Sequence, residues 1–243
     1  MAEIKKVEGI VISDTNYSES SKILNILTKE YGIIGVMSKG CRKVKSNLRI
    51  VSSKLVYGDF NIYYKENGLS TLISCDIKNY YKNILTDISK IGYATFLMEL
   101  VTQTYKQNPD EEIYNIFISS LEKIEEGLNP LIISDIVEIK LLDYLGIGFN
   151  LDGCSICGND NDIITFSTSS GGYVCKDCYT NEKIYSMKSI KVLRMLYYVD
   201  ISKITKLDLT STTIDEITEF LDDYYDTYSG LYLKSRKFLE KFQ

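Results

Sequence analysis

The cysteines are the residues of this sequence whose type and spacing point most directly to chemistry. Four of them form two C-x2-C pairs, Cys154/Cys157 and Cys175/Cys178, with seventeen residues between the pairs. Two pairs at this spacing are typical of a zinc site in which four thiolates complete a tetrahedron. A tetrahedron closed by four protein ligands leaves no position for water. We therefore expect one structural Zn²⁺ per chain.

Two disulfides or four unbound buried thiols are the alternatives for these cysteines. A redox-active pair is disfavoured, because neither C-x-x-C motif opens a helix after a buried strand. Gly158 directly follows the first pair and allows the positive φ that such tight turns often need. Cys41 and Cys75 stand apart from the others, and we expect both to be unpaired, with Cys75 a small core residue.

A run of cations is the second feature that could do chemistry. No acidic residue occurs between Tyr31 and Gly58, and this stretch carries Lys39, Arg42, Lys43, Lys45, Arg49 and Lys54. Cations at this density suit a phosphate backbone, so we expect these six residues to bind nucleic acid without reading its sequence. A solvated basic loop without a ligand is the alternative. Nearby aromatic residues that face outward could stack on bases, although each taken alone is more typical of core or ordinary strand surface: Tyr57, Phe60, Tyr63 and Tyr64.

The composition argues against an enzyme. The chain has no histidine, which excludes Ser-His-Asp and Cys-His catalysis and histidine general bases. It has no Walker A loop, and no G-x-G-x-x-G motif follows a strand. We therefore predict a binding protein that uses no nucleoside triphosphate.

Charge is unevenly distributed along the chain, which has a net charge of −5. Residues 1–83 carry 13 Lys/Arg against 8 Asp/Glu, a net charge of +5. Residues 84–150 carry −7 and residues 151–186 carry −3, whereas residues 187–243 are balanced. This asymmetry predicts a basic N-terminal module attached to an acidic body.

Short β runs fill the basic module. Residues 7–13, 22–28, 32–38, 54–64 and 69–76 are rich in Val, Ile, Leu and Tyr and are bounded by turn residues. Asn67-Gly68 predicts a type I′ hairpin turn between the last two runs. Five strands with a long insertion after the third predict an OB-type barrel over residues 1–80, with an SH3-like barrel as the alternative.

A helical period begins near Ile84 and predicts a first helix that ends near residue 106. Asn108-Pro109 and Asn129-Pro130 predict the starts of the next two helices, and the second of these is apolar on more than one side, as a central bundle helix is. A helix over residues 187–199 and another opened by a capping box at Thr213–Glu216 follow. We thus expect an α+β multidomain chain, in which helical parts over residues 81–150 and 187–243 flank a zinc ribbon over residues 151–186. The C-terminal cations could extend the basic surface, although a solvated helix is the simpler description: Lys234, Arg236, Lys237 and Lys241.

The sequence lacks the apolar run of a signal peptide and any stretch of eighteen apolar residues, which predicts a cytoplasmic protein without a membrane partner. Thiols in the cytoplasm stay reduced, which further favours metal over disulfides at the paired cysteines.

The order of these pieces resembles the RecO family of bacterial recombination mediators. The resemblance is carried by residues 17–22 and 29–32, by the basic run 39–49, by Lys140–Gly148 leading into Cys154, and by Gly171-Gly172 before Cys175. It implies an OB barrel that binds single- and double-stranded DNA and a protein that anneals complementary strands without ATP. It also implies work with RecR and with single-stranded-DNA-binding protein, indirect help to RecA, and a nucleoid-associated place in the bacterial cytoplasm.

Two other functions fit the same residues. An RNA- or ribosome-associated zinc-ribbon protein would use the same barrel and basic loop. A protein-interaction scaffold would leave the loop without a ligand. The low total basic charge of the chain and its acidic central body depart from the family resemblance, and both bear on how strongly the chain binds DNA.

Overall fold

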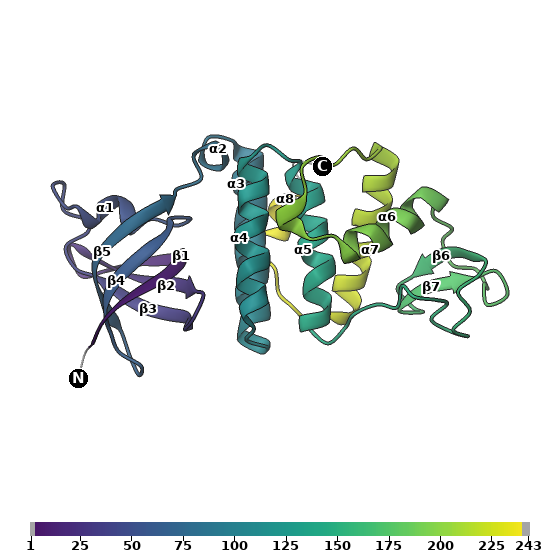
Figure 1. The fold of residues 1–243 in the computed structure, drawn as a ribbon, viewed down its shortest axis with the longest axis horizontal. Coiled ribbons are helices and arrows are strands. Elements are labelled where there is room, and N and C mark those ends of the chain that lie inside the picture. Colours follow the sequence, from purple (N-terminus) through teal and green to yellow (C-terminus); the bar gives the residue numbers. More distant parts are fainter. Residues whose placement is uncertain (1–2, 240–243) are drawn as a thin grey trace. The chain divides into compact units, whose positions relative to one another are not determined.

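The structure is a computed structural model that describes residues 3–239. It divides into two compact units, which are considered separately (Figure 1). The first unit comprises the residues up to Thr86 together with Pro109–Ile118, and the second comprises Asp87–Asn108 together with the residues from Ser119 onward. No helix among the described residues is long and apolar enough to cross a membrane.

A closed five-stranded barrel forms most of the first unit. Its strands are β1 (Glu3–Tyr17), β2 (Ser21–Thr28), β3 (Gly32–Ser38), β4 (Tyr57–Tyr64) and β5 (Ser70–Asn79), hydrogen-bonded in the order β1-β2-β3-β5-β4. Alternate residues of the strands point inward and form a core around Leu24, Phe60 and Ile62, which are fully buried. The predicted five-stranded N-terminal fold is confirmed.

Strand β1 is much longer than the predicted run, because it serves two neighbours. Its first half pairs with β4, from Glu3 opposite Tyr64 to Ile10 opposite Tyr57. Its second half pairs with β2 as far as Tyr17 opposite Ser21. The β4–β5 hairpin is present, but its loop has a positive φ only at Gly68, so the predicted type I′ turn at Asn67-Gly68 is wrong.

Helix α4 (Glu111–Glu125) contributes its first half to the barrel unit. The Tyr114 hydroxyl donates a hydrogen bond to Glu8 Oε1 on β1, at 3.2 Å. Asp110 caps the start of this helix by accepting from the Glu112 N–H at 2.7 Å. The predicted cap, Asn108, instead ends the preceding helix, so that prediction is wrong by two residues.

The second unit is a bundle of helices with a small β hairpin. Its helices are α3 (Ile88–Gln107), the second half of α4, α5 (Pro130–Tyr144), α6 (Met187–Tyr198), α7 (Ser211–Tyr228) and α8 (Arg236–Leu239). Ten of the fifteen residues of α5 are buried, as expected of a central helix, and Asn129 caps it as predicted. Helix α3 begins after its cap Asp87, later than predicted, because Tyr81 is left-handed and residues 82–85 form a separate short helix, α2 (Lys82–Leu85).

The capping box predicted at Thr213 and Glu216 does not form. The cap of helix α7 is Thr210, three residues before Thr213, so Thr213 and Glu216 both lie inside the helix. The Glu216 carboxylate instead accepts from the Ser186 N–H at 3.1 Å and from the Ser189 hydroxyl at 2.5 Å. Glu216 therefore ties α7 to the start of α6, a tertiary contact that replaces the local one.

Candidate metal centre and nucleic-acid interface

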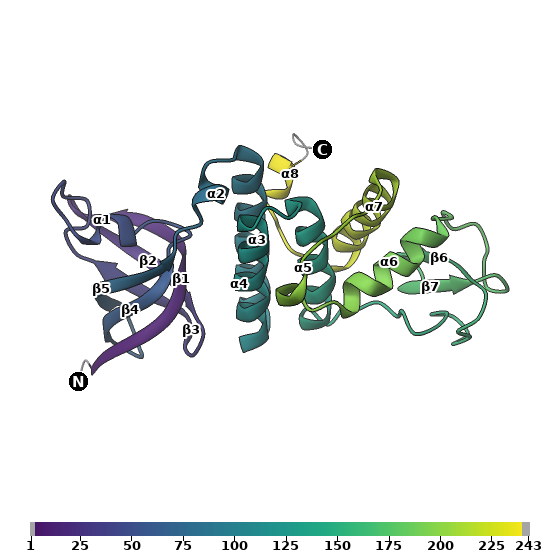
Figure 2. The same ribbon diagram turned by 45° about the horizontal axis from the view of Figure 1, so that its top comes forward.

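The four paired cysteines converge on one point beside the β hairpin of the second unit. Strands β6 (Ile163–Ser167) and β7 (Gly172–Cys175) lie antiparallel, as Figure 2 shows. The four sulfur atoms lie within 4.8 Å of one another. They come from one turn before β6, from the end of β7 and from the turn after it, so the hairpin holds the two pairs together. Four sulfurs at this separation are close enough to share one metal ion.

Backbone hydrogen bonds shape each pair into a tight turn. The Gly158 N–H donates to the Cys154 carbonyl at 2.8 Å, and the Tyr179 N–H donates to the Cys175 carbonyl at 3.0 Å. Gly158 has a φ of +76°, the conformation expected from its place after the first pair. A side chain on Gly172 would collide with the backbone of Asn150, which pairs with it to hold the preceding loop against β7.

Hydrogen bonding shifts the pKa values of two of the four thiols in opposite directions. Burial opposes the ionisation of Cys154, but hydrogen bonds from the backbone N–H groups of Cys175, Cys157 and Ile156 outweigh it and lower its pKa to about 6. A hydrogen bond with Cys157 and burial raise the pKa of Cys178. Four thiolates within 4.8 Å of one another would repel, and a divalent cation shared by them would offset that repulsion.

The predicted basic residues lie in the segment between β3 and β4, which is anchored to the barrel by its neutral groups. The Ser38 and Ser52 hydroxyls share a buried hydrogen bond of 2.7 Å across the base of the loop. The Gly40 N–H donates to Ser21 Oγ, and the Arg42 N–H donates to the Ser20 carbonyl. Cys41 is buried, and the short helix α1 (Leu48–Val51) lies within the loop.

The side chains of this loop face solvent. We call the six basic residues the loop cations: Lys39, Arg42, Lys43, Lys45, Arg49 and Lys54. All six are exposed, and none forms a salt bridge with another residue that the structure describes. The Arg42 guanidinium makes one long hydrogen bond, 3.3 Å, to the Ser18 carbonyl, which is a neutral partner.

Several other cations of the same unit are paired, although the exposed Lys65 and Lys82 have no salt bridge among the described residues. Lys6 lies 3.2 Å from Asp59, Lys22 lies 2.6 Å from Asp14, and Lys29 lies 3.7 Å from Glu111. Lys78 lies 2.6 Å from Glu8, and the hydrogen bond it donates to Glu8 raises its pKa above the usual range. The barrel thus neutralises these lysines internally, whereas the loop cations have no carboxylate to meet.

The aromatic residues near the loop divide by strand face. Phe60 is fully buried in the core. Tyr57 donates a hydrogen bond to Glu8 at 2.6 Å, and Tyr64 packs against Tyr31. Tyr63 is about half exposed and is the aromatic of this group most open to a ligand.

The C-terminal cations differ from the loop cations in their partners. Arg236, which the sequence suggested as an extension of the basic surface, is mostly buried and bonds to Glu138 and Asp222. Lys234 and Lys237 are exposed, and Lys241 lies outside the described residues. The Arg236 partners were missed from the sequence because Glu138 lies 98 residues away along the chain.

Comparison with known proteins gives a consistent result over the whole chain. The family model "Recombination protein O N terminal" matches residues 1–81, and "Recombination protein O C terminal" matches residues 85–237. The DNA repair protein RecO of Listeria monocytogenes is 37% identical over 243 residues, which cover 98% of this chain and 94% of that protein. RecO of Bacillus pumilus is 36% identical, with 98% of this chain and 94% of that protein covered. RecO of Bacillus subtilis is 33% identical over 99% of this chain and 95% of its own. With both halves of the barrel-and-bundle chain matched in order and relatives aligned end to end, the protein belongs to the RecO family of DNA repair proteins.

Proposed function

We propose that this protein binds DNA through the loop cations, anneals complementary single strands, and helps a recombinase to load on single-stranded DNA that is coated by its binding protein. The observation that carries the proposal is that the six loop cations are exposed and unpaired with any described carboxylate, while neighbouring barrel lysines are paired. Membership of a DNA repair family supports DNA as the polyanion.

The chemistry of annealing follows from binding phosphates alone. Two strands held by cations on one loop no longer repel each other strongly, because each contact displaces condensed counterions and neutralises a phosphate. The base edges stay free to pair, so the reaction tolerates any complementary sequence. The protein acts as a binding protein without turnover of ATP, and residues 1–80 are the DNA-binding module.

For the metal centre we propose one Zn²⁺ bound by Cys154, Cys157, Cys175 and Cys178. Four thiolates in a closed site suit zinc and leave no open position, so the ion supplies folding energy to residues 151–186 and no catalysis. The helical parts, residues 81–150 and 187–243, support this ribbon on both sides along the chain.

The partners we propose are RecR and the single-stranded-DNA-binding protein, with RecA served indirectly, in the bacterial cytoplasm at the nucleoid. The support is family membership, since the named relatives are DNA repair proteins. A nuclease-treated pull-down from native lysate tests these partners. If neither RecR nor the single-stranded-DNA-binding protein is recovered, the proposal is contradicted.

An annealing assay tests the function. Complementary oligonucleotides coated with the cognate single-stranded-DNA-binding protein are mixed without ATP, and duplex formation is followed with and without this protein. We expect acceleration that disappears in Arg42→Ala/Lys43→Ala. The matched control Lys6→Ala/Lys29→Ala also removes two positive charges, but from residues in salt bridges, and is expected to retain the acceleration. No acceleration, together with tight binding to structured RNA, would favour an RNA-binding function instead.

A further inference from the structure

Tyr17 is the last residue of strand β1, and its ring is 51% exposed. The side chain makes no hydrogen bond and no ring or cation contact with another residue that the structure describes. Tyr17 pairs in register with Ser21 across the turn between β1 and β2. Residues paired in this way project from the same face of a sheet, with Cβ atoms roughly 5 Å apart. Neither the proposed phosphate contacts nor the metal centre uses this tyrosine.

The face from which Tyr17 projects is where the basic loop begins. The Gly40 N–H donates to Ser21 Oγ at 3.1 Å, so the start of the loop lies directly beside the Tyr17–Ser21 pair. The Lys43 side chain lies over the same place, since a Cβ added to Gly40 would be 3.8 Å from Lys43 Cδ. A loop cation therefore lies close to an open aromatic ring.

Arg42 joins the loop to the tip of the turn. Its N–H donates to the Ser20 carbonyl at 2.9 Å, and its guanidinium donates to the Ser18 carbonyl, next to Tyr17, at 3.3 Å. Both partners are neutral, so the charge of the guanidinium remains available to a phosphate. Glu19 is exposed and carries the only carboxylate of the turn, which disfavours a phosphate over the turn itself. A bound strand would therefore lie with its phosphates on the loop and its bases toward Tyr17.

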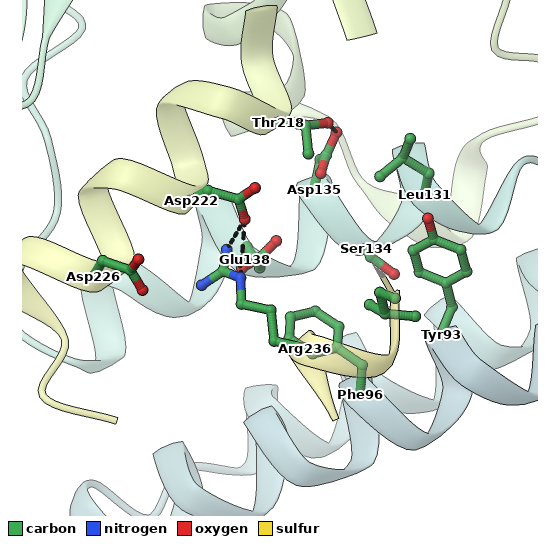
Figure 3. Close-up of a pocket in the computed structure, with 11 residues that line it drawn as sticks. Tyr93, Phe96, Leu131, Ser134, Asp135, Glu138, Thr218, Asp222, Asp226 and Arg236 are labelled. Carbon is green, nitrogen blue, oxygen red and sulfur yellow. Dashed lines mark hydrogen bonds and ion pairs between the residues drawn. The ribbon is translucent and has the colours of Figure 1, made fainter. Parts of the chain in front are cut away.

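The bundle offers a contrast, because a ring and a cation that lie together there are already engaged. The Arg236 guanidinium lies 5.9 Å from the centre of the Phe96 ring, and Glu138 and Asp222 bind it (Figure 3). At the turn that Tyr17 opens, no described carboxylate binds the neighbouring cations and no described group stacks on the ring. Cations that can hold phosphates beside a ring that can stack on a base are the combination by which proteins bind unpaired nucleotides.

We propose that Tyr17 stacks on an unpaired base of a strand whose phosphates are held by the loop cations, and that it thereby makes this surface prefer single strands to duplex. The proposal rests on the proposed DNA binding and adds a source of specificity to it. Each base of a single strand has a free face, whereas the bases of a duplex are already stacked on one another. Pairing withdraws the base from the ring, so the duplex product is held more weakly than a single strand.

Fluorescence anisotropy on the full chain tests the stack with a single strand, an abasic strand that has the same number of phosphates, and a duplex. We expect the wild type to bind the base-bearing strand at least about fivefold more tightly than the abasic strand. Tyr17→Ala should lose this difference and bind the abasic strand and the duplex as the wild type does. Its salt dependence should be unchanged, because no phosphate contact is removed. Tyr232→Ala removes an exposed tyrosine of the second unit and should bind all three probes as the wild type does.

Tyr17→Trp gives a direct spectroscopic signature. The chain has no tryptophan, so the introduced indole is the only one and reports on its own surroundings. Its emission should be quenched by the base-bearing strand and unchanged by the abasic strand. Tyr17→Trp and Tyr17→Phe should both retain the affinity that Tyr17→Ala loses, because both keep an aromatic ring.

The outcomes distinguish this proposal from the DNA binding on which it rests. If Arg42→Ala/Lys43→Ala binds the single strand as the wild type does, the loop is not the DNA-binding surface and both proposals fail. If that variant binds weakly but the wild type holds the abasic and base-bearing strands equally, DNA binding through the loop stands and the stack is overturned. Equal losses on both strands in Tyr17→Ala would indicate a displaced loop and would also overturn the stack. If Tyr17→Ala does not fold, Tyr17→Trp decides: indole emission that the base-bearing strand leaves unquenched contradicts the proposal.

Discussion

The loop cations and the C-terminal segment are both basic in sequence, yet the structure gives their charges different uses. The loop cations are exposed and meet no described carboxylate. Arg236 is held by Glu138 and Asp222, with its own side chain 19% exposed and that of Glu138 5% exposed. A count of basic residues therefore overstates the surface that a polyanion can use, and ion pairing decides which charges are available.

The difference comes from where the acids lie. The stretch between Tyr31 and Gly58 contains no acidic residue, and carboxylates elsewhere in the barrel form salt bridges with other lysines. The partners of Arg236 come from α5 and α7 and reach it only when the bundle has folded. Changes in the second unit should consequently affect stability, and changes in the loop should affect DNA binding.

Loss of the proposed metal ion should give the largest effect and sharpen this division. Cys175→Ser deletes one of four ligands, and structural zinc contributes on the order of 10 kcal/mol to a small module, so residues 151–186 should unfold. Elemental analysis should show loss of about one Zn²⁺ per chain, and hydrogen exchange should show lost protection in β6 and β7. Metal-free wild-type protein with four freely titratable thiols would contradict the metal assignment.

The next largest effect should come from Arg236→Met. It leaves the buried Glu138 without its cation and should cost about 3 kcal/mol, the low end for such pairs because Asp222 is partly exposed. Lys203→Met is the control, since it breaks a solvent-exposed pair with Asp200 and should cost much less than Arg236→Met. Denaturant unfolding measures both. Equal costs would mean that Arg236 is a surface cation like those of the loop.

The pH dependence of stability should report the same buried pair. Burial raises the pKa of Glu138 to about 7 from its ordinary 4.5, even against the opposing charge of Arg236. Between these values the folded chain keeps a proton that the unfolded chain has lost, so this group lowers stability as the pH rises and contributes no further change above about 7. In Glu138→Gln that decline should be absent. A difference between the two proteins that stays constant with pH would contradict the assignment.

A smaller effect is expected on DNA affinity from Arg42→Ala/Lys43→Ala. Two lost phosphate contacts should weaken single-strand binding by about tenfold to thirtyfold near 0.1 M salt. The protein should unfold at the same denaturant concentration as the wild type, because these side chains form no ion pair in the described structure. A loss of stability comparable to that of Arg236→Met would remove the distinction between the two regions.

The smallest expected effect is on stability, and it distinguishes the N-terminal caps of helices α5 and α7. Asn129→Ala should cost about 1 kcal/mol, because the Asn129 side chain accepts from the Leu131 N–H. Thr210→Ala should cost less than Asn129→Ala, because the Thr210 hydroxyl makes no capping hydrogen bond and only shares a hydrogen bond of 2.9 Å with the Thr213 hydroxyl. Similar costs, measured by thermal unfolding, would contradict the observed caps.

Local patterns explain which features the sequence predicted. Period-two runs gave the five strands, and the spacing of the cysteines indicated their convergence, since both are short-range signals. The length of β1 was missed because its ends depend on pairing with β4 and β2. The local pattern Thr213-x-x-Glu216 predicts a cap, whereas the partners of Glu216 are Ser186 and Ser189, about thirty residues away along the chain.

The salt dependence of single-strand binding tests the central claim most directly. Six phosphate contacts predict that log K falls against log salt with a slope near −4, at ~0.7 per contact. The slope should flatten to about −3 in Arg42→Ala/Lys43→Ala and stay near −4 in Lys6→Ala/Lys29→Ala, whose cations are paired within the barrel unit. An unchanged slope in the loop variant, or equal flattening in both variants, would contradict the claim that the unpaired loop cations form the DNA-binding surface.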